Sequence, residues 1–181
     1  VVLVKNTYDE LGRLISYSLH NEKETIHYDY HIAGMLSSVS SPRFSYRLKY
    51  ENAEIIDAIA RYNGNINTMY WKHGNEQEQA YLYNYDPFGR LTSASFKENN
   101  GLFWNNSSGK YNVSGLSYDG NGNLKSLKRF DGEGSVKHDF TYHYSNPANR
   151  NALSQVTDKG INSPLYRYDK LGNMLYDGRR D

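Results

Sequence analysis

The sequence predicts an all-β fold in which tandem hairpins join into one curved, continuous antiparallel sheet. Tyrosine is unusually common, with 18 copies in 181 residues, and its ring suits a half-buried strand surface. Aromatic residues also lie two positions apart, as at Tyr81, Tyr83 and Tyr85, which places their rings on one face of a strand. The tyrosines recur within one short motif, and such a recurrence indicates a repeat architecture.

The motif is Tyr-Asp-x-x-Gly-[Arg/Asn]-[Leu/Met], and four copies are clear. Degenerate copies begin at Tyr30, where His31 replaces the Asp, and at Tyr144, whereas Tyr50 and Tyr62 are the weakest candidates. Five of the seven steps between these starts are 20 to 26 residues long, about the length of one hairpin with its connection. The clear copies are residues 8–14 (YDELGRL), 85–91 (YDPFGRL), 118–124 (YDGNGNL) and 168–174 (YDKLGNM).

Turn chemistry explains the residues of the motif. An Asp at the first position of a turn accepts hydrogen bonds from backbone N–H groups, and the Gly three residues later supplies a positive φ. Pro87 has the fixed φ that the second turn position needs. The structural residues of the clear copies are Tyr8, Asp9, Gly12, Tyr85, Asp86, Gly89, Tyr118, Asp119, Gly122, Tyr168, Asp169 and Gly172.

Each outgoing strand is expected to contain a bulge or a bend. An apolar residue follows three positions after the motif leucine, as in Leu14 and Tyr17 or Leu36 and Val39. A spacing of three does not keep two side chains on one face of a regular strand. The sequence therefore predicts a bulge there, which would curve the sheet.

One segment breaks the β pattern between the first and second clear copies of the motif. Asn52 stands in a capping position before apolar residues at helix-like spacing, which favours a short helix. An inter-repeat loop that became apolar by packing explains the pattern equally well. The apolar residues are Ile55, Ile56, Ile59 and Ala60.

The chain is predicted to be a single repeat array over residues 1–181, because no linker composition divides it. Residues 97–110 (KENNGLFWNNSSGK) are predicted to form a longer inter-repeat loop. A long loop in a regular array is a usual place for function.

Charge and composition exclude several classes of protein. Lys and Arg number 21 against 20 Asp and Glu, so no global field attracts nucleic acid, and the small cluster of Lys125, Lys128 and Arg129 does not change this expectation. The absence of Cys excludes disulfides and thiolate metal sites. No stretch is apolar enough to span a membrane. The chain also lacks an initiator Met and reads as a piece of something longer.

No catalytic residue, metal or cofactor is expected. His27, Asp29 and His31 alternate and share one strand face, but a polar face is the favoured interpretation over a metal site. The stretch that begins at Asp119 resembles the start of an EF-hand loop but lacks its later Gly and Glu. A hydrolase built on scattered acids such as Glu54 is the remote alternative, because nothing fixes the separation of those acids.

Trp71 and Trp104 are the candidate ligand-binding residues. Exposed indole rings stack on sugars, and Trp104 lies within residues 97–110. The competing and favoured interpretation is that Phe103 and Trp104 fold back to cover an exposed face of the sheet.

The four clear motif copies and their degenerate relatives resemble the YD repeats of the Rhs family, which includes Rhs proteins, Tc toxin C subunits and teneurins. The run from Tyr62 (YNGNI) through Trp71 to the motifs at Tyr85 and Tyr118 is similar to Rhs-repeat proteins of Bacteroidetes. The resemblance covers nearly the whole chain, apart from the region around 51–61.

The resemblance implies a segment of a large β-shell that encloses or displays a C-terminal, toxin-like domain of a bacterial secreted or surface protein. The partners it implies are the remaining repeats and that domain, and the isolated chain would expose edge strands that can self-associate. The family's autoprotease carries paired DPxG elements, but this chain has one, residues 86–89, within an ordinary repeat. Proteolysis is therefore not expected. A carbohydrate- or cell-surface-binding adhesion module is the alternative.

Overall fold

The computed structural model describes residues 2–55, 57–106, 109–147 and 149–177. This part of the chain contains strands, turns and loops but no helix. Its internal contacts divide it into two compact units, one of Val1–Asn84 with Phe96–Ser107 and one of Tyr85–Ser95 with Ser108–Asp181. We call them unit 1 and unit 2.

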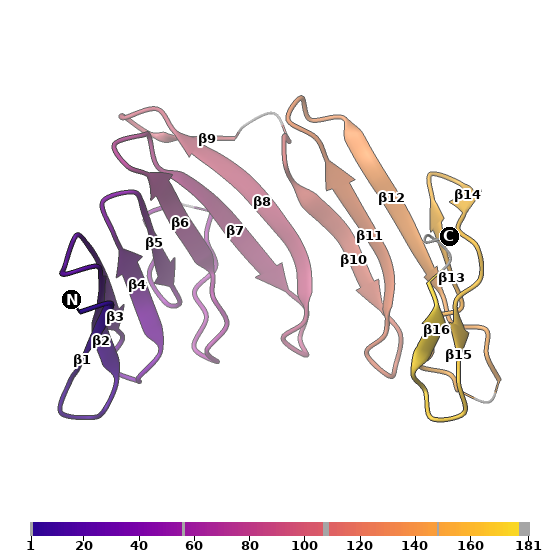
Figure 1. Cartoon of the computed structure of the whole chain (residues 1–181). Coiled ribbons are helices and arrows are strands. Elements are labelled where there is room, and N and C mark those ends of the chain that lie inside the picture. The colour runs from indigo at the N-terminus through magenta and orange to yellow at the C-terminus, as the bar shows by residue number, and fades with distance from the viewer. Residues whose placement is uncertain (1, 56, 107–108, 148, 178–181) are drawn as a thin grey trace. The chain divides into compact units, whose positions relative to one another are not determined.

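The described residues form 16 strands, which Figure 1 labels in chain order. They are β1 (Val4–Tyr8), β2 (Leu14–Leu19), β3 (Glu24–Tyr30), β4 (Leu36–Ser40), β5 (Phe44–Lys49), β6 (Thr68–His73), β7 (Gln79–Tyr85), β8 (Leu91–Asn99), β9 (Trp104–Asn106), β10 (Val113–Tyr118), β11 (Leu124–Phe130), β12 (Val136–His143), β13 (Gln155–Asp158), β14 (Ile161–Asn162), β15 (Arg167–Tyr168) and β16 (Met174–Tyr176).

Strands that are neighbours in the sequence are also neighbours in the sheet. The main 14-stranded sheet runs in order from β1 to β8 and then from β10 to β14, while β9 pairs with β8. The order begins at β1 and ends at β14, so the sheet is open. β15 and β16 form a separate two-stranded sheet. The prediction of an all-β chain of hairpins in a continuous antiparallel sheet is confirmed.

The predicted bulge is present in the outgoing strands. In the first hairpin Tyr8 lies opposite Leu14, but Thr7 lies opposite Ser16, so Ile15 is an extra residue in β2. The same single-residue shift follows the motif Leu or Met in the hairpins β3–β4, β10–β11 and β15–β16.

The bulge explains the apolar spacing of three. Tyr17 pairs with Asn6, which is two residues from Tyr8, the partner of Leu14. Because residues two apart on a strand share a face, the extra residue brings Tyr17 back to the face of Leu14. One inserted residue per hairpin therefore keeps the apolar side chains in register.

The segment between β5 and β6 is a loop and not a helix in its described residues. Ile55 is buried in a cluster with Tyr70, Ala80 and Leu82, and Ala58 packs against them. Because the described residues of this segment form no helix, the helix interpretation is wrong. Packing against the sheet of unit 1 explains why the loop is apolar. Ile56 lies outside the described residues.

The insertion at 97–110 also differs from the predicted loop. β8 continues to Asn99, and Asn99 pairs with Trp104 at the start of β9. The described part of the insertion is therefore a short hairpin, whose tip turns at Gly101 with a φ of 92°.

Candidate functional site

The four clear motifs form the same turn. In the first, Asp9 Oδ1 accepts hydrogen bonds from the backbone N–H groups of Leu11 (3.0 Å) and Arg13 (2.9 Å). Asp86, Asp119 and Asp169 make the equivalent pair of bonds. The predicted turn chemistry is confirmed, and the glycines supply positive φ: Gly12 (78°), Gly89 (78°), Gly122 (88°) and Gly172 (87°).

The alternation of Arg and Asn after the motif glycine has one chemical reason. Arg13 Nε donates to Asp9 Oδ2 at 2.7 Å, and Asn123 Nδ2 donates to Asp119 Oδ2 at 2.8 Å. Either side chain therefore satisfies the second carboxylate oxygen. The Asn123 amide lowers the pKa of Asp119, and the Arg13 backbone N–H lowers the pKa of Asp9, so both carboxylates stay ionised at neutral pH.

Two turns depart from the motif in sequence and keep its geometry. Asp131, in FDGEGSV, accepts bonds from the N–H groups of Glu133 and Ser135 at 2.9 Å each. Phe130 stands where the motif has Tyr, so a search for Tyr-Asp misses this turn. The Asp-x-x-Gly spacing of Asp131 and Gly134 is the sequence signal that identifies it. His31 takes the Asp position of its own turn, and its Nδ1 accepts from the Ala33 N–H at 3.2 Å.

A hydrogen bond joins each of five repeats to the one before it. The hydroxyl of the motif tyrosine donates to the backbone carbonyl of the leucine in the preceding tyrosine-led copy of the motif, and we call this bond the tyrosine lock. The pairs are Tyr30–Leu14 (2.9 Å), Tyr50–Leu36 (2.8 Å), Tyr118–Leu91 (2.8 Å), Tyr144–Leu124 (3.0 Å) and Tyr168–Leu153 (3.0 Å). Tyr50, a weak candidate in the sequence, is thus a repeat tyrosine in the structure.

Cations and burial reinforce the tyrosine locks. The Arg13 guanidinium lies 4.9 Å from the centre of the Tyr30 ring, and Arg90 lies 4.6 Å from that of Tyr118. A motif arginine therefore holds its own Asp and covers the tyrosine of the next repeat. Burial raises the pKa of Tyr118, which keeps its hydroxyl protonated as the donor.

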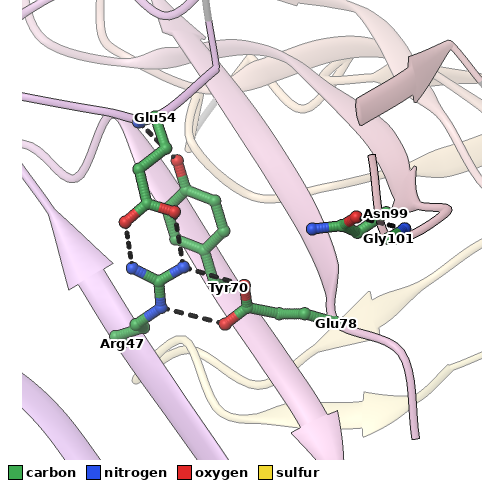
Figure 2. A network of polar contacts seen from close by, with 6 residues as sticks. All are labelled: Arg47, Glu54, Tyr70, Glu78, Asn99 and Gly101. Atoms are coloured by element: carbon green, nitrogen blue, oxygen red, sulfur yellow. Dashed lines mark hydrogen bonds and ion pairs between the residues drawn. The ribbon is translucent and has the colours of Figure 1, made fainter. Parts of the chain in front are cut away.

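A polar cluster fastens the β5–β6 loop to the sheet of unit 1 (Figure 2). Arg47 Nε and Nη2 donate to the two oxygens of Glu78 at 2.9 and 2.8 Å, and Nη1 and Nη2 donate to the two oxygens of Glu54. Its guanidinium lies 4.3 Å from the ring centre of Tyr70, whose hydroxyl accepts the Glu54 N–H at 2.9 Å. We call these four residues the Arg47 clamp.

The charges of the Arg47 clamp suit it to holding the β5–β6 loop against the sheet. The hydrogen bonds that Arg47 donates lower the pKa of Glu54, and the bonds that the Glu54 and Glu78 carboxylates accept raise the pKa of Arg47. Arg47 and Glu54 therefore stay charged across the neutral range. A carboxylate whose oxygens both face a guanidinium is poorly placed to take a proton from a substrate.

A cleft of about 400 Å³ lies beside the clamp in unit 1. Trp104 is half-buried, and its ring lies 5.2 Å from that of Tyr70 in an edge-on arrangement. Phe103 is 60% exposed, and the Lys97 ammonium lies 3.8 Å from the Asp57 carboxylate. The residues that line the cleft are Glu54, Ile55, Asp57, Lys97, Leu102, Phe103 and Trp104.

The structure does not bring Trp71 and Trp104 together. Trp71 follows Tyr70 directly in β6, so the two side chains point to opposite faces of the sheet, and Trp104 packs on the Tyr70 face. Trp71 stacks on Tyr81 with ring centres 5.3 Å apart and also contacts Phe96. A single ligand therefore does not bridge the two indole rings.

No group of three or more His, Asp or Glu side chains suited to a metal occurs within residues 2–55, 57–106, 109–147 and 149–177. In unit 2, His138 Nδ1 lies 2.7 Å from Asp158 Oδ2, and the His138 and Phe140 rings stack with their centres 4.8 Å apart. No helix in the described part of the chain is long and apolar enough to cross a membrane.

Comparison with solved structures identifies the fold. A crystal structure of TcdB2–TccC3–Cdc42 matches 94% of this chain with a TM-score of 0.64 and 14% sequence identity. A crystal structure of TcdB2–TccC3 without its hypervariable C-terminal region matches the same share with a TM-score of 0.61 and 14% identity. The chain spans 9% of the length of each solved chain.

No protein-family model and no curated protein matches the sequence. The structural matches show that the chain has the YD-repeat fold of Rhs proteins and Tc toxin C subunits.

Proposed function

We propose that this chain is a non-catalytic wall segment of a YD-repeat shell, which encloses or displays a C-terminal domain of a larger secreted or surface protein. The observation that carries the proposal is the tyrosine lock, which joins consecutive hairpins in five places. A single hairpin is marginally stable in water, and each lock ties one to its neighbour. The recurrence of the same hydrogen bond at five junctions suits a scaffold that extends by repeating one hairpin unit.

The compared structures support the proposal in two respects. The fold is shared over 94% of this chain, and the chain equals 9% of a solved chain, as expected for one stretch of a long wall. One solved protein is described as TcdB2–TccC3 without its hypervariable C-terminal region. By analogy, a variable domain would follow the repeats in the polypeptide that contains this chain.

Limited proteolysis of that whole polypeptide tests the proposal. The region after the repeats should resist protease in the native protein and become sensitive when Tyr118→Phe and Tyr144→Phe weaken two tyrosine locks. Tyr62→Phe is the matched control, because Tyr62 is 84% exposed and stands outside the five locks. A C-terminal region that is cut equally fast in the native protein and in the double variant would contradict enclosure.

A second candidate function is glycan binding, and the cleft beside Trp104 favours it. The cleft combines the aromatic rings of Phe103 and Trp104 with the polar ends of Asp57 and Lys97. Pyranose rings have apolar faces and hydroxyl edges, which such a lining suits.

A glycan array with matched variants tests this candidate. Phe103→Ala should abolish specific binding, whereas Phe88→Ala should leave it intact, because Phe88 is equally an exposed aromatic residue but lies outside the cleft. Binding that survives Phe103→Ala, or no binding by the native chain, would reject the adhesion role and leave the scaffold role unaffected.

A further inference from the structure

The cleft beside Trp104 is lined by interior strands of the array. Its residues come from the β5–β6 loop, from β8 and from the hairpin that joins β8 to β9. The sheet continues on both sides of these strands, to β1 and to β14, so neither edge strand lines the cleft. Its volume of about 400 Å³ lies within the range of roughly 300–1,000 Å³ that is usual for ligand pockets.

The apolar part of the cleft is formed by side chains at the tip of the β8–β9 hairpin. Phe103 is 60% exposed and Leu102 is 89% exposed, although Phe and Leu are among the residue types most often buried. Trp104 packs edge-on against Tyr70 and thereby anchors the hairpin to the sheet of unit 1. The exposed ring of Phe103 offers a flat face, which suits the apolar face of a sugar ring.

Two charged groups of the cleft, Asp57 and Lys97, differ in how far they reach into water. The Asp57 side chain is 70% exposed, whereas the Lys97 side chain is 9% exposed. Among the described residues, Lys97 is the ion-pair partner of Asp57, and their separation of 3.8 Å is too long for a hydrogen bond. The Asp57 carboxylate therefore keeps acceptor capacity for a ligand, while the attraction of the recessed Lys97 ammonium holds it at the cleft.

Glu54, the other carboxylate of the cleft, is already satisfied. Both of its oxygens accept hydrogen bonds from Arg47 (Figure 2), and the charges of Arg47 and Lys49 offset its own. A ligand that enters the cleft therefore meets the accessible negative charge of Asp57 together with the exposed ring of Phe103. A cation gains from both, because the carboxylate attracts it and the face of an aromatic ring carries negative potential.

We propose that the cleft binds glycans that carry a free amino group, with the sugar ammonium on the Asp57 carboxylate and the apolar face of the sugar ring on Phe103. The proposal rests on the glycan-binding candidate above and names its ligand class. A neutral N-acetylated sugar would cover the Asp57 carboxylate without supplying a countercharge, which costs desolvation free energy. An acidic sugar would be repelled by the same carboxylate. The cleft therefore selects amino sugars over both.

A pair of oligosaccharides tests the proposal on the native chain. Tetrasaccharides of glucosamine and of N-acetylglucosamine with the same linkage differ only at the nitrogen, which is an ammonium in the first and a neutral amide in the second. Their affinities are measured by isothermal titration calorimetry in mildly acidic buffer, which keeps the sugar amine protonated. Asp57→Asn removes the charge from an exposed side chain of the cleft. Asp29→Asn is the matched control, because Asp29 is also exposed and lies outside the cleft.

The native chain should bind the glucosamine tetrasaccharide more tightly than its N-acetylated counterpart. Asp57→Asn should weaken binding of the glucosamine tetrasaccharide about five-fold, the upper end for one exposed ion pair, and remove the preference. Asp29→Asn should leave both affinities unchanged. Equal affinities of the native chain for the two tetrasaccharides, or a preference that survives Asp57→Asn, would overturn the proposal.

The glycan-binding candidate itself has a separate readout in the array. If other glycans bind in a manner that Phe103→Ala abolishes, while the glucosamine tetrasaccharide does not bind, the ligand class is wrong and glycan binding stands. If the native chain binds no glycan, both the ligand class and the glycan-binding candidate are rejected, and the scaffold role is unaffected.

Discussion

A single hydroxyl does two tasks at each tyrosine lock. It ties one hairpin to the next, and at Leu14, Leu36 and Leu124 it also satisfies a backbone carbonyl beside a bulge, where the regular ladder is interrupted. The ring adds apolar cover, and in two repeats an arginine lies over it. Removing the hydroxyl while keeping the ring therefore isolates the hydrogen bond from the packing.

Tyr118→Phe should destabilise the folded chain by about 1 kcal/mol, because the Leu91 carbonyl loses its donor at 2.8 Å. Urea unfolding measured by the shift in midpoint checks this. Tyr62→Phe is the control and should shift the midpoint by less than about 0.5 kcal/mol, as is usual for a surface change. A loss no larger than that of the control would argue against the lock.

The turn carboxylates make stability depend on pH. Hydrogen bonds within the turn lower the folded-state pKa of Asp9, Asp119, Asp131 and Asp169, led by the N–H of the residue four positions on or by the motif Asn. A lowered folded-state pKa stabilises the fold above the ordinary Asp value of about 3.9 and ceases to do so as the pH falls through the lower value.

Asp119→Asn should flatten this acid dependence. The Asn side chain can still accept a backbone N–H bond but carries no charge to titrate. Unfolding midpoints measured from neutral pH to about pH 2 should therefore fall less steeply in the variant than in the native chain. Parallel pH profiles would show that the Asp119 carboxylate adds nothing to acid stability.

At the scale of the hairpin, turn and bulge act as one unit. The glycine closes the turn with a positive φ, and the extra residue of the outgoing strand restores the apolar face. Gly120 and Gly122 lie in the same turn. Comparing them separates the effect of backbone conformation from the effect of the space around an added Cβ. Neither has an atom within 4 Å of an added Cβ, but only Gly122 has a positive φ, of 88°.

Gly122→Ala should therefore cost about 1–2 kcal/mol of folding free energy, the penalty of the left-handed conformation for a residue with a Cβ. Gly120→Ala should be neutral or stabilise by up to about 1 kcal/mol, through the unfolded chain. Chemical denaturation of both variants measures the difference. Similar stabilities for the two would contradict the assigned turn.

The hairpins were predictable from the sequence because their residues act locally. Asp9 and Gly12 lie within one turn, and the spacing from Leu14 to Tyr17 predicted the bulge. The tyrosine lock was not predictable, because the backbone carbonyl of any residue type can accept such a bond, and the motif leucine is explained by its apolar side chain alone. The Arg47 clamp joins residues up to 31 positions apart, which a local pattern does not register.

At the scale of the molecule, the described residues form an open sheet of hairpins, and in unit 1 a loop packs on part of one face. The β5–β6 loop and β9 supply Ile55, Ala58 and Trp104 to one cluster in unit 1. The sequence favoured Trp104 folding back onto a face of the sheet, and it packs on Tyr70, but which residues it meets there depended on where the loop folds. The remaining strands rely on neighbours along the sheet, which is how a repetitive wall is stabilised.

Electron cryomicroscopy of the longest natural polypeptide that contains these residues tests the central claim most directly. The account predicts that residues 1–181 form one stretch of the wall of a hollow β-shell, with the Tyr118 hydroxyl within hydrogen-bond distance of the Leu91 carbonyl. A compact closed barrel or sandwich with no enclosed space, or a Tyr118 hydroxyl directed away from Leu91, would contradict it.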